Sequence, residues 1–161
     1  MPLPDDFHEQ SLYHSDRWYL HELIELDPEA GLVVAVMDTE RLTDWVADQR
    51  PWPGHPGHVP GAVVVQATAT LGNLHAVYCL GLKLTDGWVG FGTHLKQARF
   101  GRLGTVGPPV TATLTCTRAR KIRGVWFTDY QFRFEQEGEA IYTSEQTAAW
   151  TRTDHRGPVP G

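Results

Sequence analysis

Residues 52–82 read WPGHPGHVPGAVVVQATATLGNLHAVYCLGL, and this stretch decides the fold. A loop rich in proline, glycine and histidine runs directly into a segment, Gly61 to Leu80, that contains no Asp, Glu, Lys or Arg. A helix that is apolar nearly all round is typical of a protein core. Scattered polar residues interrupt the segment, which makes it a poor bilayer span, since a span needs about 20 predominantly apolar residues. We therefore expect a buried central helix from Gly61 to about Leu80.

The start of this helix is the first candidate for a functional site. Val63, Val64 and Val65 favour a strand, but the length of the apolar segment favours a helix. Pro60 and Gly61 then mark its beginning. The first amides of a helix lack internal partners and carry partial positive charge, so they can hold a carbonyl oxygen or an oxyanion. The alternative is a turn that only leads into a core helix.

Composition indicates one globular domain. The chain has 161 residues, of which 41% are hydrophobic and 11% aromatic, enough for one core. We expect a single domain over residues 1–161, with loose tails at 1–12 and 153–161. The net charge of −5 gives no basic footprint for nucleic acid, and the short basic run 118–123 is typical of a solvated strand end.

Cysteine content and the N-terminus bear on the compartment. Cys79 and Cys116 each lie in an apolar or alternating pattern, which indicates small buried residues and no disulfide framework. The first ten residues, MPLPDDFHEQ, show neither a secretory signal nor an anchor. We expect a cytoplasmic protein that does not bind membranes.

The remainder of the chain has strand patterns. Short β-branched or alternating runs separated by turn residues predict strands at 17–26, 32–37, 88–100, 110–118, 125–135 and 140–151, with a helical turn within 38–49. One buried helix among antiparallel strands gives an α+β fold in which a sheet wraps the helix.

Three stretches in this order resemble the hotdog-fold 3-hydroxyacyl-acyl-carrier-protein dehydratases. PGHPGHVPGAVVVQATA is similar to the family pattern H-F-P-G-x-P-x-x-P-G-x-x-x-x-E/D-A-x-A. GTHLKQARFGRL is similar to the pattern G-x-x-x-A-R-F-x-R, and a hairpin at Glu137-Gly138-Glu139 follows. The resemblance covers about Tyr13 to Arg152.

The resemblance implies a hotdog fold and a homodimer, or a higher oligomer, whose sheets join edge to edge. It also implies sites at the dimer interface for an acyl thioester carried by acyl carrier protein or coenzyme A. The family removes water from a 3-hydroxyacyl thioester with a His and a Glu or Asp, one from each subunit. Gly61 matches the glycine whose amide polarises the thioester carbonyl.

The sequence departs from the family pattern at both proton-transferring positions. Gln66 stands where the family has its carboxylate, and an amide cannot exchange protons near neutral pH. The family histidine falls on Trp52, or on Pro51 if the longer loop is allowed for. His55 and His58 lie closer to the helix and are the candidate bases, since histidine titrates near neutral pH. The alternative is that both are ordinary loop residues.

Other polar residues are candidate substrate contacts. The resemblance places His94, Gln97 and Arg99 on a strand that lines the acyl pocket, whereas solvent or the dimer edge is the alternative for their side chains. His55 and His58 with His75 or His94 lack regular zinc spacing, so we expect no metal, and no other cofactor is implied.

Three functions follow from these observations. The first is a dehydratase-like enzyme of fatty-acid or polyketide metabolism that uses other acid–base residues, with His55, His58 and Gln66 as catalytic candidates. The second is a hotdog thioesterase, in which a histidine-bound water attacks a carbonyl held at Gly61. The third is a non-catalytic binder of acyl or polyketide chains, or a cyclase-like protein.

Overall fold

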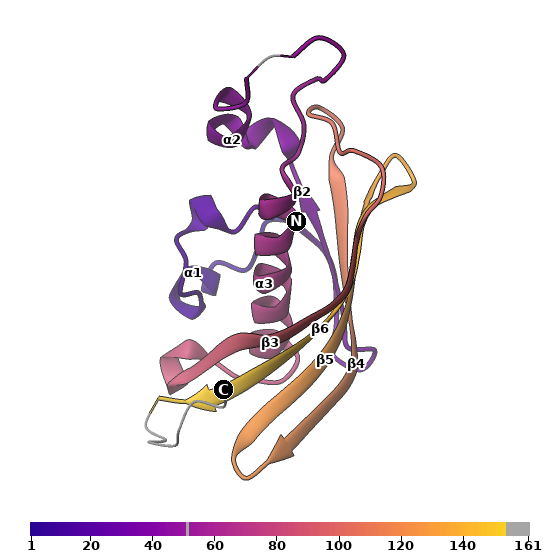
Figure 1. Cartoon of the computed structure of the whole chain (residues 1–161). Helices are drawn as coiled ribbons and strands as arrows, with labels where there is room; N and C mark the ends of the chain where they lie inside the picture. Colours follow the sequence, from indigo (N-terminus) through magenta and orange to yellow (C-terminus); the bar gives the residue numbers. More distant parts are fainter. Residues whose placement is uncertain (51, 154–161) are drawn as a thin grey trace.

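A six-stranded antiparallel sheet curves around one long helix in the computed structural model, which describes residues 1–50 and 52–153 (Figure 1). The strand order is β1-β2-β4-β5-β6-β3. The strands are β1 (Glu22–Asp27), β2 (Leu32–Met37), β3 (Trp88–Phe100), β4 (Val110–Ile122), β5 (Val125–Gln136) and β6 (Glu139–Arg152). This arrangement confirms the predicted α+β class.

The central helix is α3, which spans Gly61–Tyr78 and lies against the inner face of the sheet (Figure 1). It ends two residues before the expected end because Gly81, with φ of 70°, turns the chain toward β3. Its sheet-facing side is fully buried, with Val63, Leu71 and Leu74 inaccessible to solvent. The opposite side is not covered, because Ala62 and Ala69 are exposed. One chain therefore buries only part of a helix that the sequence indicated to be buried all round.

Strand alternation places the core as predicted. Every second residue of β2 is fully buried, namely Val33, Ala35 and Met37. Burial alternates along β5 in the same way. Strand β4 continues four residues beyond the predicted Arg118 because it pairs with β5 as far as Ile122. Arg123 and Gly124 both have positive φ, which gives the tight hairpin turn that joins the two long strands.

The N-terminal residues are packed, in contrast to the loose tail expected over 1–12. Phe7 of the short helix α1 (Phe7–Gln10) is fully buried and contacts the Trp18 ring at 4.7 Å between centroids. Pro2 forms a bridge with Glu22 at the sheet edge. Burial of one aromatic side chain is sufficient to hold such an arm. Of the expected C-terminal tail, residues 154–161 lie outside the described residues.

Short helical turns connect these elements: η1 (Ser15–Arg17), η2 (Thr39–Arg41), α2 (Thr43–Ala47) and η3 (Leu84–Asp86). The predicted start of the strand over 17–26 was wrong, because Arg17 lies in η1 and β1 begins only at Glu22. The predicted helical turn within 38–49 is confirmed by η2 and α2. Within residues 1–50 and 52–153, no helix is long and apolar enough to cross a membrane.

Candidate active site at the start of helix α3

The first turn of α3 has no side-chain cap and lies beneath an aromatic ring. Pro60 precedes the helix in an extended conformation, and no side chain caps this end. A Cβ atom added at Gly61 would lie 2.8 Å from Cε1 of Phe100, so only glycine fits beneath this ring. The amides of this turn carry the partial positive charge of the helix N-terminus.

Two histidines precede this turn, and the structure holds them differently. Oε1 of Gln49 accepts from the backbone N–H of His58 at 3.0 Å, and Nε2 of Gln49 donates to its carbonyl at 2.8 Å. The Nδ1 atom of His58 is buried and has no hydrogen-bond partner in the described part of the chain. The ring of His55 is exposed and lies 5.0 Å from that of His58. The structure therefore favours His58 over His55 as the positioned group.

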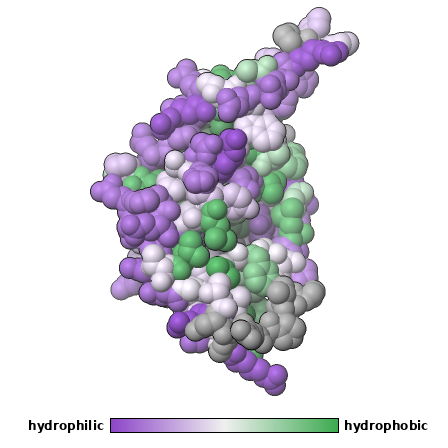
Figure 2. All heavy atoms as spheres, turned by 90° about the vertical axis from the view of Figure 1, so that its left-hand side faces the viewer, coloured by the Kyte–Doolittle hydropathy of each residue, from purple (hydrophilic) through white to green (hydrophobic). Residues whose placement is uncertain are grey.

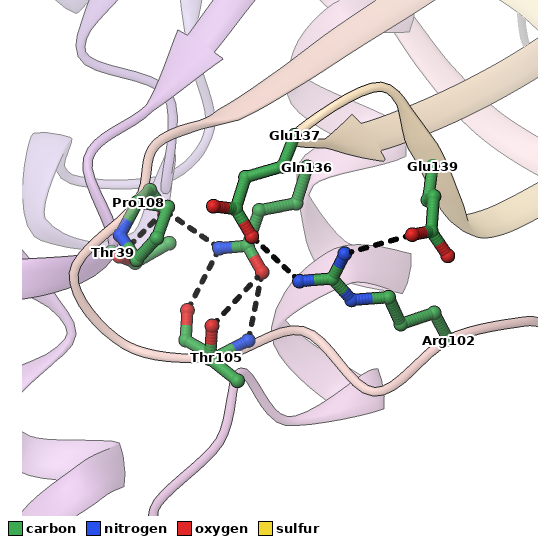
Figure 3. A network of polar contacts seen from close by, with 7 residues as sticks. All are labelled: Thr39, Arg102, Thr105, Pro108, Gln136, Glu137 and Glu139. Carbon is green, nitrogen blue, oxygen red and sulfur yellow. Dashed lines mark hydrogen bonds and ion pairs between the residues drawn. The ribbon is translucent and has the colours of Figure 1, made fainter.

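The loop after β3 fixes the histidine loop from its other side. Val59 donates to the carbonyl of Gly104 at 2.8 Å, and His58 forms a bridge with Thr105. Gln136 is fully buried and clamps Thr105 in turn: its Oε1 accepts from the Thr105 amide at 2.9 Å and its Nε2 donates to the Thr105 carbonyl at 2.8 Å (Figure 3). Gln49 thus holds the histidine loop, Gln136 holds the loop after β3, and the two loops are hydrogen-bonded to each other.

An outer layer of the same network closes the β5–β6 turn. Nε2 of Gln136 also donates to the carbonyl of Pro108, which accepts a second bond from the hydroxyl of Thr39 (Figure 3). Arg102 bridges Glu137 at 2.6 Å and Glu139 at 3.2 Å. These carboxylates are exposed and paired with arginine at the surface, where such ion pairs add little stability.

Three buried side-chain polar atoms lack a partner within the described residues: His58 Nδ1, Gln66 Nε2 and the Tyr142 hydroxyl. Gln66 lies in the second turn of α3. Tyr142 is fully buried between Phe134 and Phe100, and the Phe100 ring is the one that covers Gly61. The three residues are thus linked to the first turns of α3: His58 precedes Gly61 by three residues, Gln66 lies on the helix, and Tyr142 packs on the ring that covers Gly61. Such orphaned groups mark a place where a ligand or water completes the hydrogen bonding.

The three polar residues predicted on β3 are not brought to this place within one chain. Arg99 pairs with Thr143, whose neighbours Tyr142 and Ser144 are buried, so Arg99 points to the outer face of the sheet. Gln97 and Arg99 line an outer-face hollow of about 530 Å³ with residues of β4 and β5. His94 is exposed and lies 3.2 Å from the Thr147 hydroxyl. Substrate contact by His94, Gln97 and Arg99 stays a prediction.

A cavity follows α3 away from its first turn. It has a volume of about 290 Å³ and lies between the third turn of α3 and strands β3 and β6. Ala69 and Gly72 are small residues on the helix side, and Gly92 leaves space on β3, whereas the Trp150 ring packs directly on Gly90. Ala69 is three residues beyond Gln66 on the same side of the helix, so the cavity begins about one turn from the candidate site.

Other titratable residues in the core have structural roles. Burial lowers the pKa of His75 to about 4, and its Nδ1 lies 3.2 Å from the Tyr130 hydroxyl. Cys79 and Cys116 are only partly buried, less than predicted, and burial raises the pKa of the Cys79 thiol to about 11. Among the described residues, no three His, Cys, Asp or Glu side chains gather as a metal site would require.

No family model and no curated protein matches the sequence. Solved structures do match. The thioesterase HI1161 of Haemophilus influenzae is 22% identical, with a TM-score of 0.57 over 84% of this chain and 82% of that one. The dehydratase heterocomplex ApeI:P of Xenorhabdus doucetiae is 12% identical, with a TM-score of 0.64 over 96% and 95%. A mutant of thioesterase PA1618 of Pseudomonas aeruginosa is 17% identical, with a TM-score of 0.61 over 93% and 96%.

These similarities show that the chain has the hotdog fold, as the sequence motifs predicted. They do not single out the dehydratases, because thioesterases and a dehydratase match over comparable lengths. At these identities the likeness concerns the fold, so the activity has to be argued from this chain's own residues.

Four site residues escaped the sequence analysis: Gln49, Gln136, Tyr142 and Gln146. A signal existed for two of them. Gln136 and Gln146 fall in the inward phase of their strands, after Phe134 and Ser144, and a polar residue in that phase indicates a buried hydrogen-bond network. No local signal marks Gln49 or Tyr142, because their roles depend on segments distant in the sequence.

Proposed function

We propose that this protein hydrolyses an acyl thioester at the first turn of α3, with coenzyme A or acyl carrier protein as the thiol. The observation that carries the proposal is the set of unpartnered atoms on His58, Gln66 and Tyr142, which includes one imidazole and one carboxamide but no carboxylate. Hydrolysis needs a single base and a polarised carbonyl, because a thiolate leaves readily. The likeness to thioesterases of the same fold supports this reading.

Each residue then has one task. The thioester carbonyl accepts a hydrogen bond from the Gly61 amide, which stabilises the oxyanion that forms. Gln66 donates its free N–H to the reacting end of the substrate. His58 takes a proton from water as the C–O bond forms, the C–S bond breaks, and the imidazolium returns the proton to the thiolate. The products are the carboxylic acid and the free thiol.

Dehydration of a 3-hydroxyacyl thioester is the second candidate, because the dehydratase heterocomplex matches 96% of this chain. That reaction needs a base for C2 and an acid for the leaving hydroxyl. His58 supplies one group, and the buried hydroxyl of Tyr142 is the remaining unpartnered donor. A phenol is a weaker acid than a carboxylic acid, so dehydration by this chain is expected to be slow compared with hydrolysis.

The expected partner in assembly is a second copy of the chain. Strand β3 is an edge strand of 13 residues whose outer backbone groups are free to pair. Its residues Leu95 and Phe100 are 52% and 62% exposed, on the face turned toward α3. The α3 side of the molecule also carries an apolar area among hydrophilic surroundings (Figure 2). Sedimentation at micromolar concentration tests the dimer, and a monomer there would exclude it.

The reaction is tested with a panel of saturated, 3-hydroxyacyl and enoyl thioesters of coenzyme A and acyl carrier protein, followed by mass spectrometry. Release of free acid and thiol, lost in His58→Ala, supports hydrolysis. Loss or gain of water without thiol release supports dehydration instead. Saturable binding without any turnover supports the non-catalytic reading, in which the same cavity only holds the acyl chain.

A further inference from the structure

The cavity beside α3 contains one side-chain oxygen, Oε1 of Gln146, that the protein satisfies only weakly. Nε2 of Gln146 donates to the hydroxyl of Thr68 at 3.0 Å and to that of Ser144 at 3.1 Å, which uses both of its hydrogens. These two bonds place the amide nitrogen of Gln146 toward Thr68 and Ser144. Its Oε1 oxygen remains available as an acceptor.

The only contact of this oxygen with a donor, among the described residues, is a weak one. The Thr68 hydroxyl lies 3.4 Å from Oε1 of Gln146 but 2.6 Å from the carbonyl of Val65. A hydroxyl has one hydrogen, and the shorter contact takes it. Oε1 of Gln146 therefore lacks an effective donor from the protein.

Three other polar side chains of the cavity are already engaged, whereas Tyr13, which also lines it, is exposed to solvent. The Tyr130 hydroxyl contacts His75, the Thr147 hydroxyl contacts that of Thr93 at 2.6 Å, and the indole N–H of Trp150 donates to Thr128. The rest of the wall is apolar or small, and none of the lining residues is charged. A saturated chain would fill this cavity but leave the Gln146 oxygen without a partner, which costs free energy.

The distance between this oxygen and the candidate site determines how far from its carbonyl a bound acyl chain must carry a hydrogen-bond donor. Gln146 contacts Thr68, seven residues after Gly61, which corresponds to about 10 Å along the axis of α3. Consider an acyl chain whose carbonyl lies at Gly61 and which runs along the helix. The part of this chain that reaches Gln146 lies well beyond its third carbon. The hydroxyl of an ordinary 3-hydroxyacyl group lies too close to the carbonyl to make this contact.

We infer that the acyl chain bound here carries a hydroxyl group remote from the thioester, and that Gln146 selects for it by accepting its hydrogen bond. This inference rests on the proposed function, because it assumes an acyl thioester whose carbonyl docks at Gly61. It adds the class of chain: oxygenated at a distance from the carbonyl, and not a plain saturated fatty acyl group.

The test is a binding comparison with non-hydrolysable thioether analogues of medium-chain acyl coenzyme A. One series is saturated and the other carries a single hydroxyl, placed at successive carbons from the middle of the chain to its end. We expect the unmodified protein to bind the best hydroxylated analogue about tenfold more tightly than its saturated counterpart, as one satisfied buried hydrogen bond provides. Gln146→Met should remove this preference by weakening the hydroxylated analogue alone.

Gln131→Met is the matched control, since Gln131 is an exposed glutamine on the outer face of β5, and it should retain the preference. Equal affinity of the unmodified protein for both series would overturn the inference, even if Gln146→Met failed to fold. The inference would also be overturned if a folded Gln146→Met variant still preferred the hydroxylated analogue. Binding of neither series would instead overturn the proposed function, while binding without preference leaves that function standing.

Discussion

Gln49 and His58 are joined by two hydrogen bonds between one side-chain amide and one residue's backbone, with lengths of 2.8 and 3.0 Å. Nine residues separate them in the sequence, so this pair closes the loop that leads into α3. The loop is rich in proline and glycine, and this clamp holds the backbone of His58 in one position.

Replacement of Gln49 by Ala should therefore impair the site more than the fold. We expect a loss of stability of about 1–2 kcal/mol from two hydrogen bonds, together with a decrease in turnover of at least tenfold because His58 is no longer fixed. Amide hydrogen exchange at His58 and Val59 should accelerate. Gln131→Ala, on the outer face, serves as control. Unchanged exchange and turnover in Gln49→Ala would show that the clamp is not needed.

The two loop histidines should differ in importance. His58→Ala is expected to reduce thioester hydrolysis by about 10²–10⁴-fold, the usual contribution of a positioned base. His55→Ala should have a much smaller effect because its ring is exposed. Steady-state rates of both variants and of the double variant test this order. Near-full activity of the double variant would remove the catalytic assignment altogether.

Gln66→Glu restores the carboxylate of the dehydratase pattern without restoring its histidine. We expect little dehydration from this variant, since a carboxyl group alone supplies only one of the two proton-transferring groups. Hydrolysis should also fall, because the donor N–H of Gln66 is replaced by an acceptor. Mass spectrometry with a 3-hydroxyacyl thioester is the measurement. Efficient dehydration by Gln66→Glu, or by the unmodified protein, contradicts this account.

Gln136→Leu should be strongly destabilising. The side chain is fully buried and satisfies the amide and carbonyl of Thr105 and the carbonyl of Pro108. Buried polar groups left without partners cost about 1–3 kcal/mol each, so we expect a loss of about 3 kcal/mol or more in the free energy of unfolding. Chemical denaturation measures it. Arg102→Ala, which breaks the exposed ion pairs with Glu137 and Glu139, should leave the free energy of unfolding nearly unchanged.

The lowered pKa of His75 predicts that the protein loses stability in acid. Its pKa falls from 6.5 to about 4 on burial, so above pH 6.5 it is neutral in both states and contributes no pH dependence. Between pH 6.5 and 4 the unfolded chain binds a proton that the folded chain does not, which favours unfolding by an amount on the order of 3 kcal/mol. His21, whose pKa burial also lowers, adds to this trend.

Denaturation at pH 7, 5.5 and 4.5 tests the contribution of His75. The variant His75→Phe should lose part of the decline, whereas His14→Gln, at an exposed position, should keep all of it. An identical decline in His75→Phe and the unmodified protein would assign the acid sensitivity to other groups.

The sequence by itself determined the elements that depend on local periodicity. The long, uncharged and mostly apolar segment from Gly61 predicted α3, and alternation predicted β2 and β5, because such patterns match the burial of a core helix and of a strand with one apolar side. The start of α3 at Gly61 followed from local Pro-Gly chemistry, and the structure has it at that residue. The two departures from the dehydratase pattern were also visible in the sequence alone.

Only the tertiary structure decided which side chains face the site. The pairing of β3 with β6 shifts between Lys96 and Arg99, and Gln97 in this bulge has a φ of 48°. A shift of one residue exchanges the faces of a strand, so Arg99 points outward and Phe100 turns inward onto Gly61. The choice of His58 over His55, and the free oxygen of Gln146, depend likewise on partners far away in the sequence. Local patterns do not encode such contacts, because they arise from the register in which distant segments pack.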